Sequence, residues 1–330
     1  MSLSHRPRRL RANAAIRNLV SENQIRPQQL ILPLFVREGL LEPKPIKGLP
    51  GVVQHTTESL RREIDSALAA GIGGVMVFGI PDHHDEQGSE ALNPNGVLAN
   101  AVRDIRAQVG DRLVVIADLC LDEFTSHGHC GVLGKPDAAG NASVDNDATL
   151  EIYGRMAVVL AEAGAHMLGA SGMMDGQVGA TRAALDASGH QDVSILAYAA
   201  KYASAFYGPF REAVESQLDG DRKTYQQDPR NSRESIREIK LDAAEGADII
   251  MVKPALAYLD VIRDAREAVD LPIASYVVSG EMAMIEAAAT QGLIAREPAI
   301  LEALNSVNRA GAKIICTYWA IEVAGWLNRR

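Results

Sequence analysis

The stretch ATLEIYGRMAVVLAEAGAHMLGAS (148–171) shows one unit of the fold. Its first part carries apolar residues at helical spacing and ends in a glycine, which is typical of a helix and its C-terminal cap. Its second part, AHMLGAS (165–171), is a short apolar run of strand length. A helix followed closely by a buried strand is the repeating unit of an α/β architecture.

Seven further apolar runs lie along the chain, so the sequence predicts eight strands. The other runs are LILPLFV (30–36), GGVMVFGI (73–80), LVVIADLC (113–120), SILAYAAK (194–201), ADIIMVK (247–253), PIASYVVS (272–279) and AKIICTYW (312–319). Continuous apolar strands are typical of a parallel sheet covered by helices on both faces. Eight such alternations favour a closed (β/α)8 TIM barrel over residues 30–330. An open dinucleotide-binding sheet is disfavoured, because no G-x-G-x-x-G follows the first strand.

Two segments fall outside this alternation. Residues 1–29 are basic with interleaved apolar residues, which predicts an N-terminal arm that contacts a neighbouring subunit rather than a solvated tail. The apolar residues are Leu10, Ile16, Leu19 and Val20. Residues 206–233 are rich in Gly, Pro, Arg and aromatic residues. Long loops in compact domains are often functional, and the aromatic residues predict an ordered lid.

Composition and charge argue against several classes of protein. The 330 residues include 33 Lys+Arg and 42 Asp+Glu, a net charge of −9, which argues against nucleic-acid binding through overall charge. We expect no membrane span and no secretory signal, because long apolar runs are missing. Three cysteines are too few for a disulfide scaffold, so we expect a cytoplasmic protein in a reducing compartment.

Polar side chains end several of the predicted strands. In TIM barrels the active site is built at the carboxyl ends of the strands. These positions hold Asp118, Cys120, Ser171, Lys201, Lys253, Ser279 and Tyr318. Because lysine is almost never fully buried without a purpose, the two lysines are the strongest candidates for catalysis.

Two lysines on neighbouring strand ends suggest amine chemistry. We expect the amino groups of Lys201 and Lys253 to lie close together, where a second cation and desolvation lower an amine pKa. A neutral amine can attack a ketone to form a Schiff base. Alternatively, each lysine could extend out of the barrel mouth to pair with a loop carboxylate. The presence of two lysines favours the catalytic interpretation.

The loop ADLCLDEFTSHGHCG (117–131) is dense in metal-ligand residues. Cys120, Asp122 and Cys130 would leave an open position for substrate or water, as a catalytic zinc requires. This donor set is harder than three thiolates, so Mg²⁺ or mixed occupancy stays open. The alternative is two ordinary buried cysteines beside a polar loop.

The predicted lid supplies further candidates. Arg211 and Arg222 could each hold a substrate carboxylate in a bidentate pair, although either one alone is more often a surface charge. Tyr207 and Phe210 flank Arg211 and could shield the site from water.

The chain resembles the porphobilinogen synthase family, also called 5-aminolevulinate dehydratase. The resemblance extends from residue 6 to about residue 320. It is carried by RPRRLR, LPLFVREG, FGIPD, TSHGHCG, SGMMDGQVGA, KYASAFYGPFR, GDRKTYQ, IREIKLDAAEGADIIMVKPA, VSGEMAMI and AGAKIICTYWA. It implies a hydro-lyase that condenses two molecules of 5-aminolevulinate into porphobilinogen, with loss of two waters, in heme biosynthesis.

The resemblance also implies roles for the residues at the amines. Lys253 would form the Schiff base with the substrate that becomes the propionate side, and Lys201 would be the partner lysine for the other substrate. Asp118 and Ser171 would line the site near the amines.

The same matching implies two carboxylate sites. The carboxylate of the second substrate would be held by Arg211, Arg222 and Gln226. The carboxylate of the first substrate would be held by Ser279 and Tyr318.

The metal loop departs from the zinc-type pattern of the family. Zinc-dependent relatives carry three cysteines, whereas other relatives carry aspartates, and this chain has an intermediate set. Zn²⁺ is our first expectation. The resemblance further implies an allosteric Mg²⁺ at Glu238 and a homo-octamer assembled through the N-terminal arms.

Two other functions compete with this interpretation. A class I aldolase also uses a barrel lysine, but it lacks the cysteine-containing metal loop and the paired lysines. A barrel without activity could instead bind only a metabolite or a metal.

Overall fold

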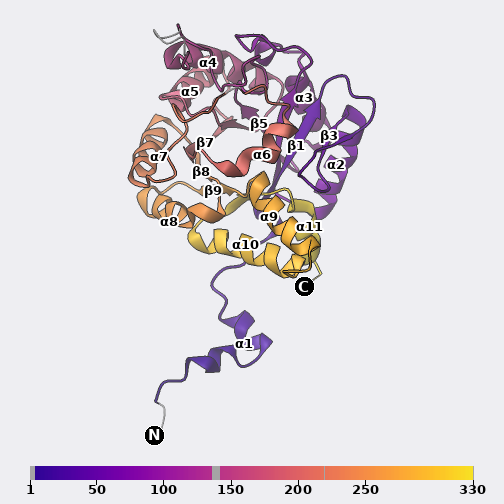
Figure 1. Ribbon diagram of the computed structural model, residues 1–330, viewed down its shortest axis with the longest axis vertical. Helices are drawn as coiled ribbons and strands as arrows, with labels where there is room; N and C mark the ends of the chain where they lie inside the picture. Colours follow the sequence, from indigo (N-terminus) through magenta and orange to yellow (C-terminus); the bar gives the residue numbers. More distant parts are fainter. Residues whose placement is uncertain (1–3, 136–141, 219, 330) are drawn as a thin grey trace.

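A computed structural model describes residues 4–135, 142–218 and 220–329. Within these residues, eight parallel strands close into a barrel surrounded by helices (Figure 1). The barrel strands are β1 (Leu30–Arg37), β4 (Gly74–Ile80), β5 (Val114–Leu119), β6 (Met167–Ala170), β7 (Ser194–Lys201), β8 (Ile249–Lys253), β9 (Ile273–Tyr276) and β10 (Ile314–Cys316). They pair in this order, and β10 pairs with β1 to complete the ring. The predicted TIM barrel is confirmed.

Each predicted apolar run contains one barrel strand, but several strands are shorter than their runs. Ser279 is the first residue of α9 (Ser279–Thr290), and Tyr318 lies in the turn between β10 and α11 (Ala320–Leu327). The prediction that these two residues end strands is therefore wrong. An apolar run does not distinguish a buried strand from the buried start of the helix that follows it.

Helices connect successive strands around the outside of the barrel. They are α2 (Thr57–Ala70), α3 (Val97–Val109), α4 (Asn146–Glu162), α5 (Gln177–Ala187), α7 (Arg233–Glu245), α8 (Leu259–Ala268) and α10 (Arg296–Ala310). Local sequence fixes their ends. In α2, for example, the Thr56 hydroxyl accepts a hydrogen bond from the Ser59 N–H at 3.1 Å, and Gly71 ends the helix with φ 73°.

The barrel also carries short elements that the sequence did not predict. Strands β2 (Lys44–Pro45) and β3 (Val53–His55) form an antiparallel pair that extends the sheet beside β1. Single helical turns, all 3-10, lie in the connections. They are η1 (Pro7–Arg11), η2 (Pro27–Gln29), η3 (Ser89–Leu92), η4 (Ala205–Tyr207) and η5 (Leu256–Tyr258).

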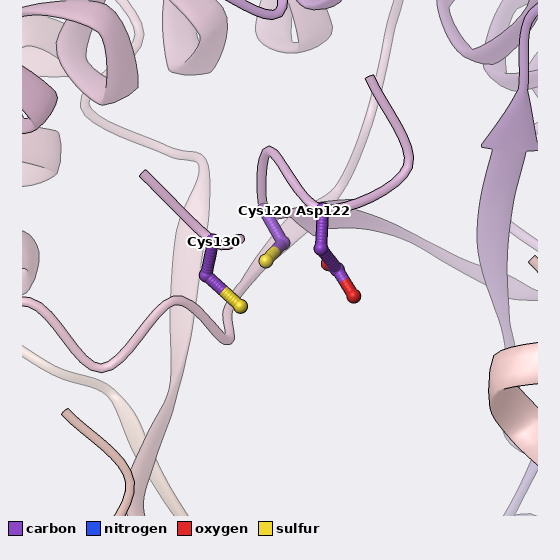
Figure 2. Close-up of side chains that lie close together, drawn as sticks. All are labelled: Cys120, Asp122 and Cys130. Atoms are coloured by element: carbon purple, nitrogen blue, oxygen red, sulfur yellow. The ribbon is translucent and has the colours of Figure 1, made fainter. Parts of the chain in front are cut away.

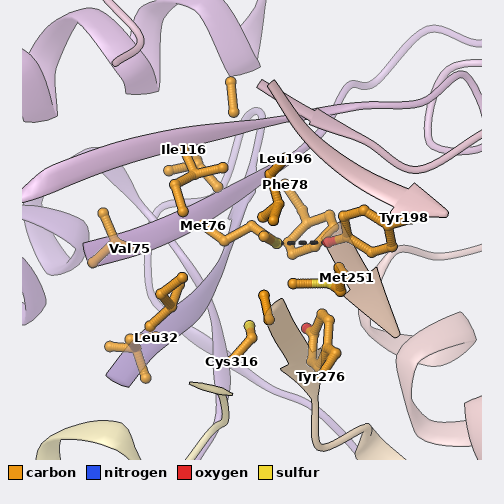
Figure 3. Close-up of a cluster of buried hydrophobic side chains, with 14 of the residues drawn as sticks. Leu32, Val75, Met76, Phe78, Ile116, Leu196, Tyr198, Met251, Tyr276 and Cys316 are labelled. Atoms are coloured by element: carbon orange, nitrogen blue, oxygen red, sulfur yellow. Dashed lines mark hydrogen bonds between the residues drawn. The ribbon is translucent and has the colours of Figure 1, made fainter. Parts of the chain in front are cut away.

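The interior of the barrel is a packed core rather than a channel. Figure 3 shows side chains from several strands meeting there, including Met76, Met251 and Tyr276. The Tyr198 hydroxyl donates a hydrogen bond to the Met76 sulfur at 2.8 Å, so the core satisfies its polar group internally. This filled core supports the strand ends that carry the polar candidates.

The N-terminal segment leaves the barrel as an extended arm (Figure 1). It contains η1 and the short helix α1 (Ala14–Leu19), and neither buries a residue within the described chain. Leu19 is 84% exposed, and Leu10 and Val20 are also exposed. Exposed apolar side chains grouped on one segment favour contact with another surface. Subunit contact through the arm stays a prediction.

The described residues of the predicted lid, 206–218 and 220–233, pass over the carboxyl ends of the strands. The short helix α6 (Gly208–Ala213) lies across the centre of the view in Figure 1. The ring of Phe210 packs edge-on against Phe78 and Phe35, with centroids 5.3 and 5.8 Å apart. Glu215 anchors the segment, because its carboxylate accepts hydrogen bonds from Arg37 and Lys44. None of the helices in the described ranges is long and apolar enough to cross a membrane.

A glycine in β4 tests how closely the helices pack on the barrel. A Cβ added at Gly79 would lie 2.6 Å from the Leu98 Cβ and 2.9 Å from its backbone, so the start of α3 would have to move. We expect Gly79→Ala to lower the free energy of unfolding by about 1–3 kcal/mol. The control is Gly325→Ala in α11, where an added Cβ meets nothing within 4 Å and helix propensity favours alanine. Urea unfolding measures both, and equal stabilities would contradict the expected close packing.

Candidate active site

Lys201 and Lys253 lie side by side at the carboxyl ends of β7 and β8. Their Cα atoms are partners in the sheet register, and both residues are buried. The two Nζ atoms lie 5.7 and 5.4 Å from the ring centroid of Tyr198. Because both lysines are buried, the alternative in which each extends into solvent is wrong.

Lys253 lies in an aromatic pocket. Its Nζ is 4.4 Å from the ring centroid of Tyr276, 4.8 Å from that of Phe210 and 5.4 Å from that of Tyr207. Burial and then the charge of Lys201 lower the pKa of Lys253 to about 8. About a tenth of this amine is therefore neutral at pH 7, which is far more than for an ordinary lysine.

Lys201 has the opposite electrostatic balance. Burial lowers the pKa of Lys201, but the neighbouring Cys130, Cys120 and Asp122 outweigh it and raise the pKa above its ordinary value. The Lys201 amino group also donates a hydrogen bond to the Ser171 carbonyl at 2.6 Å. The pair therefore consists of one charged amine and one amine that can lose its proton.

Asp118 is the penultimate residue of β5 and lies close to the two amines. Burial and the charge of Asp122 raise the pKa of Asp118 to about 7. Its Oδ1 atom is buried without a hydrogen-bond partner among the described residues. A carboxyl group with a pKa near neutrality can take up and release a proton, which is the property of a general acid or base.

Cys120, Asp122 and Cys130 form the candidate metal cluster. One ligand atom from each residue lies within 4.8 Å of the others, and all three residues are buried. Figure 2 shows the three side chains converging from the loop after β5. Burial raises the pKa of the Cys120 thiol, whereas the hydrogen bond from Cys120 and the charge of Arg222 overcome burial and lower the pKa of Cys130 to about 7. Two sulfurs and a carboxylate this close together fit a divalent cation, which would stabilise the deprotonated thiols.

Arg222 connects the lid segment to the metal loop. Its guanidinium lies 2.9 Å from the Asp122 carboxylate and donates a hydrogen bond to the Gly128 carbonyl at 2.7 Å. Burial disfavours the charged carboxylate, but Arg222 and Lys201 hold the pKa of Asp122 below its usual range. Arg222 Nε and Gln226 Nε2 are buried without partners in the described structure. These two donors are free to bind an acceptor such as a carboxylate.

The remaining candidates are Ser279, Tyr318 and Arg211. Ser279 accepts a hydrogen bond from the Phe210 N–H at 3.0 Å, so its hydroxyl contacts the lid backbone. The Tyr318 hydroxyl lies 3.3 Å from that of Tyr276, one of the rings around Lys253. Arg211 lies on α6 and is exposed, so the structure does not place it with the buried donors.

Comparison with known proteins gives the family. The family model described as delta-aminolevulinic acid dehydratase matches residues 4–326. The chain belongs to the delta-aminolevulinic acid dehydratase family. A relative of that name from Streptomyces coelicolor is 58% identical over 321 residues, covering 97% of this chain and 96% of its own. One from Mycobacterium tuberculosis is 56% identical over 324 residues, covering 98% and 97%.

A solved structure of the family has the same architecture. The delta-aminolevulinic acid dehydratase of Toxoplasma gondii, in complex with the reaction product porphobilinogen, superposes with a TM-score of 0.94. It is 45% identical, and the match covers 98% of this chain and 92% of that chain. The family resemblance stated from the sequence is therefore confirmed.

Glu238 lies in the outer helix α7 and not on the strands β7 and β8 that carry Lys201 and Lys253. It lines a cavity of about 580 Å³ together with Asp175, Asp228 and Glu234. Burial and the charge of Asp175 raise the pKa of Glu238. A carboxylate among other carboxylates is compatible with a cation, but it does not identify one.

The structure adds residues to the site that no sequence motif indicates. Glu123 follows Asp122 and is buried beside it, and burial raises its pKa well above the usual value. Glu281 lies in the segment VSGEMAMI and is also buried. Tyr198 stands within an apolar strand run, and only the closed barrel shows that its ring lies near both lysines. Glu123 and Glu281 could have been found from the sequence, because each is an acidic residue within a metal-binding or largely apolar segment.

The lowered pKa of Lys253 predicts a pH dependence. With a pKa of about 8, about a tenth of the amine is neutral at pH 7, against roughly one part in 2,500 for an ordinary lysine. Because deprotonation produces the nucleophile, imine formation with acetone should accelerate as pH rises and level off above pH 8. Borohydride trapping followed by mass spectrometry measures this rate. A midpoint near pH 10 would contradict the shift.

Proposed function

We propose that this chain is a cytoplasmic porphobilinogen synthase that condenses two molecules of 5-aminolevulinate. Its family membership supports this reaction, and so does the product named for the Toxoplasma gondii structure. The observation that carries the proposal is the pairing of Lys201 and Lys253 in register, with the pKa of Lys253 lowered to about 8. The Schiff-base chemistry needs this neutral amine.

Lys253 would begin the reaction on the first substrate. Its neutral amine adds to the ketone carbon, and loss of the carbonyl oxygen as water leaves an iminium linkage to Nζ. The iminium withdraws electrons from the adjacent carbon, so a proton there is lost more easily. Asp118, with a pKa of about 7, is the group we assign to proton transfer near this linkage.

The two carboxylates would set the orientation of the substrates. We assign the second carboxylate to Arg222 and Gln226, because Arg222 Nε and Gln226 Nε2 are donors without partners in the described structure. Arg211 would join them only if α6 moved inward. Ser279 and Tyr318 would hold the first carboxylate, and the Ser279 hydroxyl would donate its hydrogen bond to that carboxylate instead of to the Phe206 carbonyl.

Lys201 would hold the second substrate beside the metal loop. Its pKa is raised, and its amino group lies against the Ser171 carbonyl, so its charge balances Asp122 and the thiols. We propose Zn²⁺ for the cluster of Cys120, Asp122 and Cys130. When bound, this ion supplies a Lewis acid that favours the unprotonated amine of the second substrate.

A class I aldolase is the competing function, and the site favours it less. An aldolase needs one imine-forming lysine and no cluster of two cysteines and an aspartate. Here the cluster lies close enough to the paired lysines for its residues to raise the pKa of Lys201.

Replacing Lys253 tests the assigned nucleophile. We expect Lys253→Ala to abolish porphobilinogen formation, and Lys253→Arg to do the same, because a guanidinium stays protonated and cannot form the imine. The pyrrole product is measured by colour formation with an aromatic aldehyde reagent. Substantial turnover by Lys253→Arg would contradict the role.

Replacing a cluster cysteine tests the metal site. Cys130→Ser should reduce Zn²⁺ affinity by tenfold or more, because a hydroxyl is a much weaker ligand than a thiolate. Cys316→Ser is the control, since Cys316 is also buried but lies outside the cluster. Elemental analysis and competition with a chelator measure affinity. Equal Zn²⁺ affinities in both variants would show that the cluster is not the metal site. Activity restored by Mg²⁺ alone would identify Mg²⁺ rather than Zn²⁺ as the bound metal.

The family resemblance and the exposed arm also support a proposal about assembly. We propose a homo-octamer built through the arms, with an allosteric Mg²⁺ at Glu238 that favours the active assembly. Exposed Leu10, Leu19 and Val20 support a subunit contact. Deleting residues 1–29 should therefore reduce the assembly, as measured by sedimentation at micromolar concentration. A full-length monomer, or an unchanged assembly after deletion, would contradict this proposal.

A further inference from the structure

Glu281 is a buried carboxylate that the catalytic scheme above does not use. It lies in the first turn of α9 and is 1% exposed. Its oxygens accept hydrogen bonds from the N–H groups of Leu256 at 2.6 Å, Val278 at 2.7 Å and Ala255 at 3.2 Å. Hydrogen bonds to a carboxylate are stronger than those between neutral groups. One side chain therefore fixes two separate loops.

The first of these loops begins at Lys253. Pro254 follows the lysine and has no N–H, so Ala255 and Leu256 carry the first backbone donors after it. Glu281 binds both donors. The Lys253 carbonyl itself accepts a hydrogen bond from the Tyr202 N–H at 3.0 Å. The backbone that directly follows the lysine is thus held by Tyr202 and by Glu281.

The second loop leads into the proposed carboxylate site. Val278, which Glu281 binds, precedes Ser279, whose hydroxyl accepts the hydrogen bond from Phe210. The ring of Phe210 in turn lies 4.8 Å from Lys253 Nζ. A Cβ added at Gly280 would lie 2.5 Å from the Phe206 carbonyl oxygen, so the lid backbone rests directly on the start of α9.

We propose that Glu281 is a positioning residue that holds Lys253, Ser279 and the Phe206–Phe210 part of the lid in one geometry. It acts through backbone hydrogen bonds and does not touch the substrate. The inference rests on the proposed function, in which Lys253 attacks the ketone while Ser279 holds the carboxylate of the same molecule. The distance between these two groups must match the substrate, and a misplacement of about 1 Å can reduce a rate by about a hundredfold.

The test compares Glu281→Gln with Glu286→Gln. Glutamine keeps the size of the side chain but replaces one acceptor oxygen with an NH2 group that would face a backbone N–H. We expect Glu281→Gln to reduce kcat tenfold or more and to slow borohydride-trapped adduct formation at Lys253 in parallel. The midpoint of the pH profile should stay near 8, because the carboxylate acts on position rather than on the charge of the amine.

Glu286 provides a matched control on the same helix. It is buried, but its carboxylate binds Arg296 and the Trp319 indole rather than the loop after Lys253. We expect Glu286→Gln to lower Tm while the trapping rate and kcat stay at wild-type values. This pattern separates loss of position from general loss of stability.

Each other outcome also decides the question. Glu281→Gln with wild-type kcat and trapping rate would overturn the inference, as would a shift of the pH midpoint that accounts for the lost rate. If Glu281→Gln does not fold, Glu281→Asp replaces it, since aspartate keeps the charge but withdraws the oxygens by one methylene. A wild-type rate in that variant would equally overturn the inference. Absence of any adduct in the wild-type protein would instead refute the Schiff-base assignment and remove the inference with it.

Discussion

Two basic amines share one buried barrel mouth, and the rest of the site depends on how their charges are balanced. The register of β7 and β8 makes Lys201 and Lys253 partners. Burying two ammonium groups side by side is costly, so the surroundings must favour the charge on one of them. Cys130, Cys120 and Asp122 lie near Lys201 and raise its pKa, whereas aromatic rings surround Lys253. The metal loop and the lid therefore give the two lysines different pKa values.

This balance explains why the site is assembled from distant parts of the chain. The metal loop follows β5, Arg222 reaches it from the lid segment, and Phe210 from the same segment covers Lys253. Glu281 then ties the loop after Lys253 to the start of α9. Each contact excludes water from the amines or fixes their position, and both effects strengthen electrostatic interactions inside the mouth.

The sequence predicted the barrel and the lysine pair well, because both depend on local patterns. Apolar runs such as 247–253 mark strands, and a lysine at the end of such a run marks the strand end. Contacts that depend on three-dimensional packing could not be predicted from the sequence. The Arg222–Asp122 ion pair joins residues 100 positions apart. Tyr198 lies within an apolar strand, and nothing in that run of sequence indicates that its ring lies near both lysines. Ser279 and Tyr318 were placed on strands because apolar runs continue into buried helix starts.

The most direct test of the account is to identify which lysine carries the substrate. Incubation with 5-aminolevulinate and borohydride, followed by proteolysis and mass spectrometry, locates the reduced adduct. The account predicts an adduct on the peptide that contains Lys253 under conditions in which the amine pKa of about 8 leaves part of it neutral. An adduct confined to Lys201, or no adduct while porphobilinogen still forms, would contradict it.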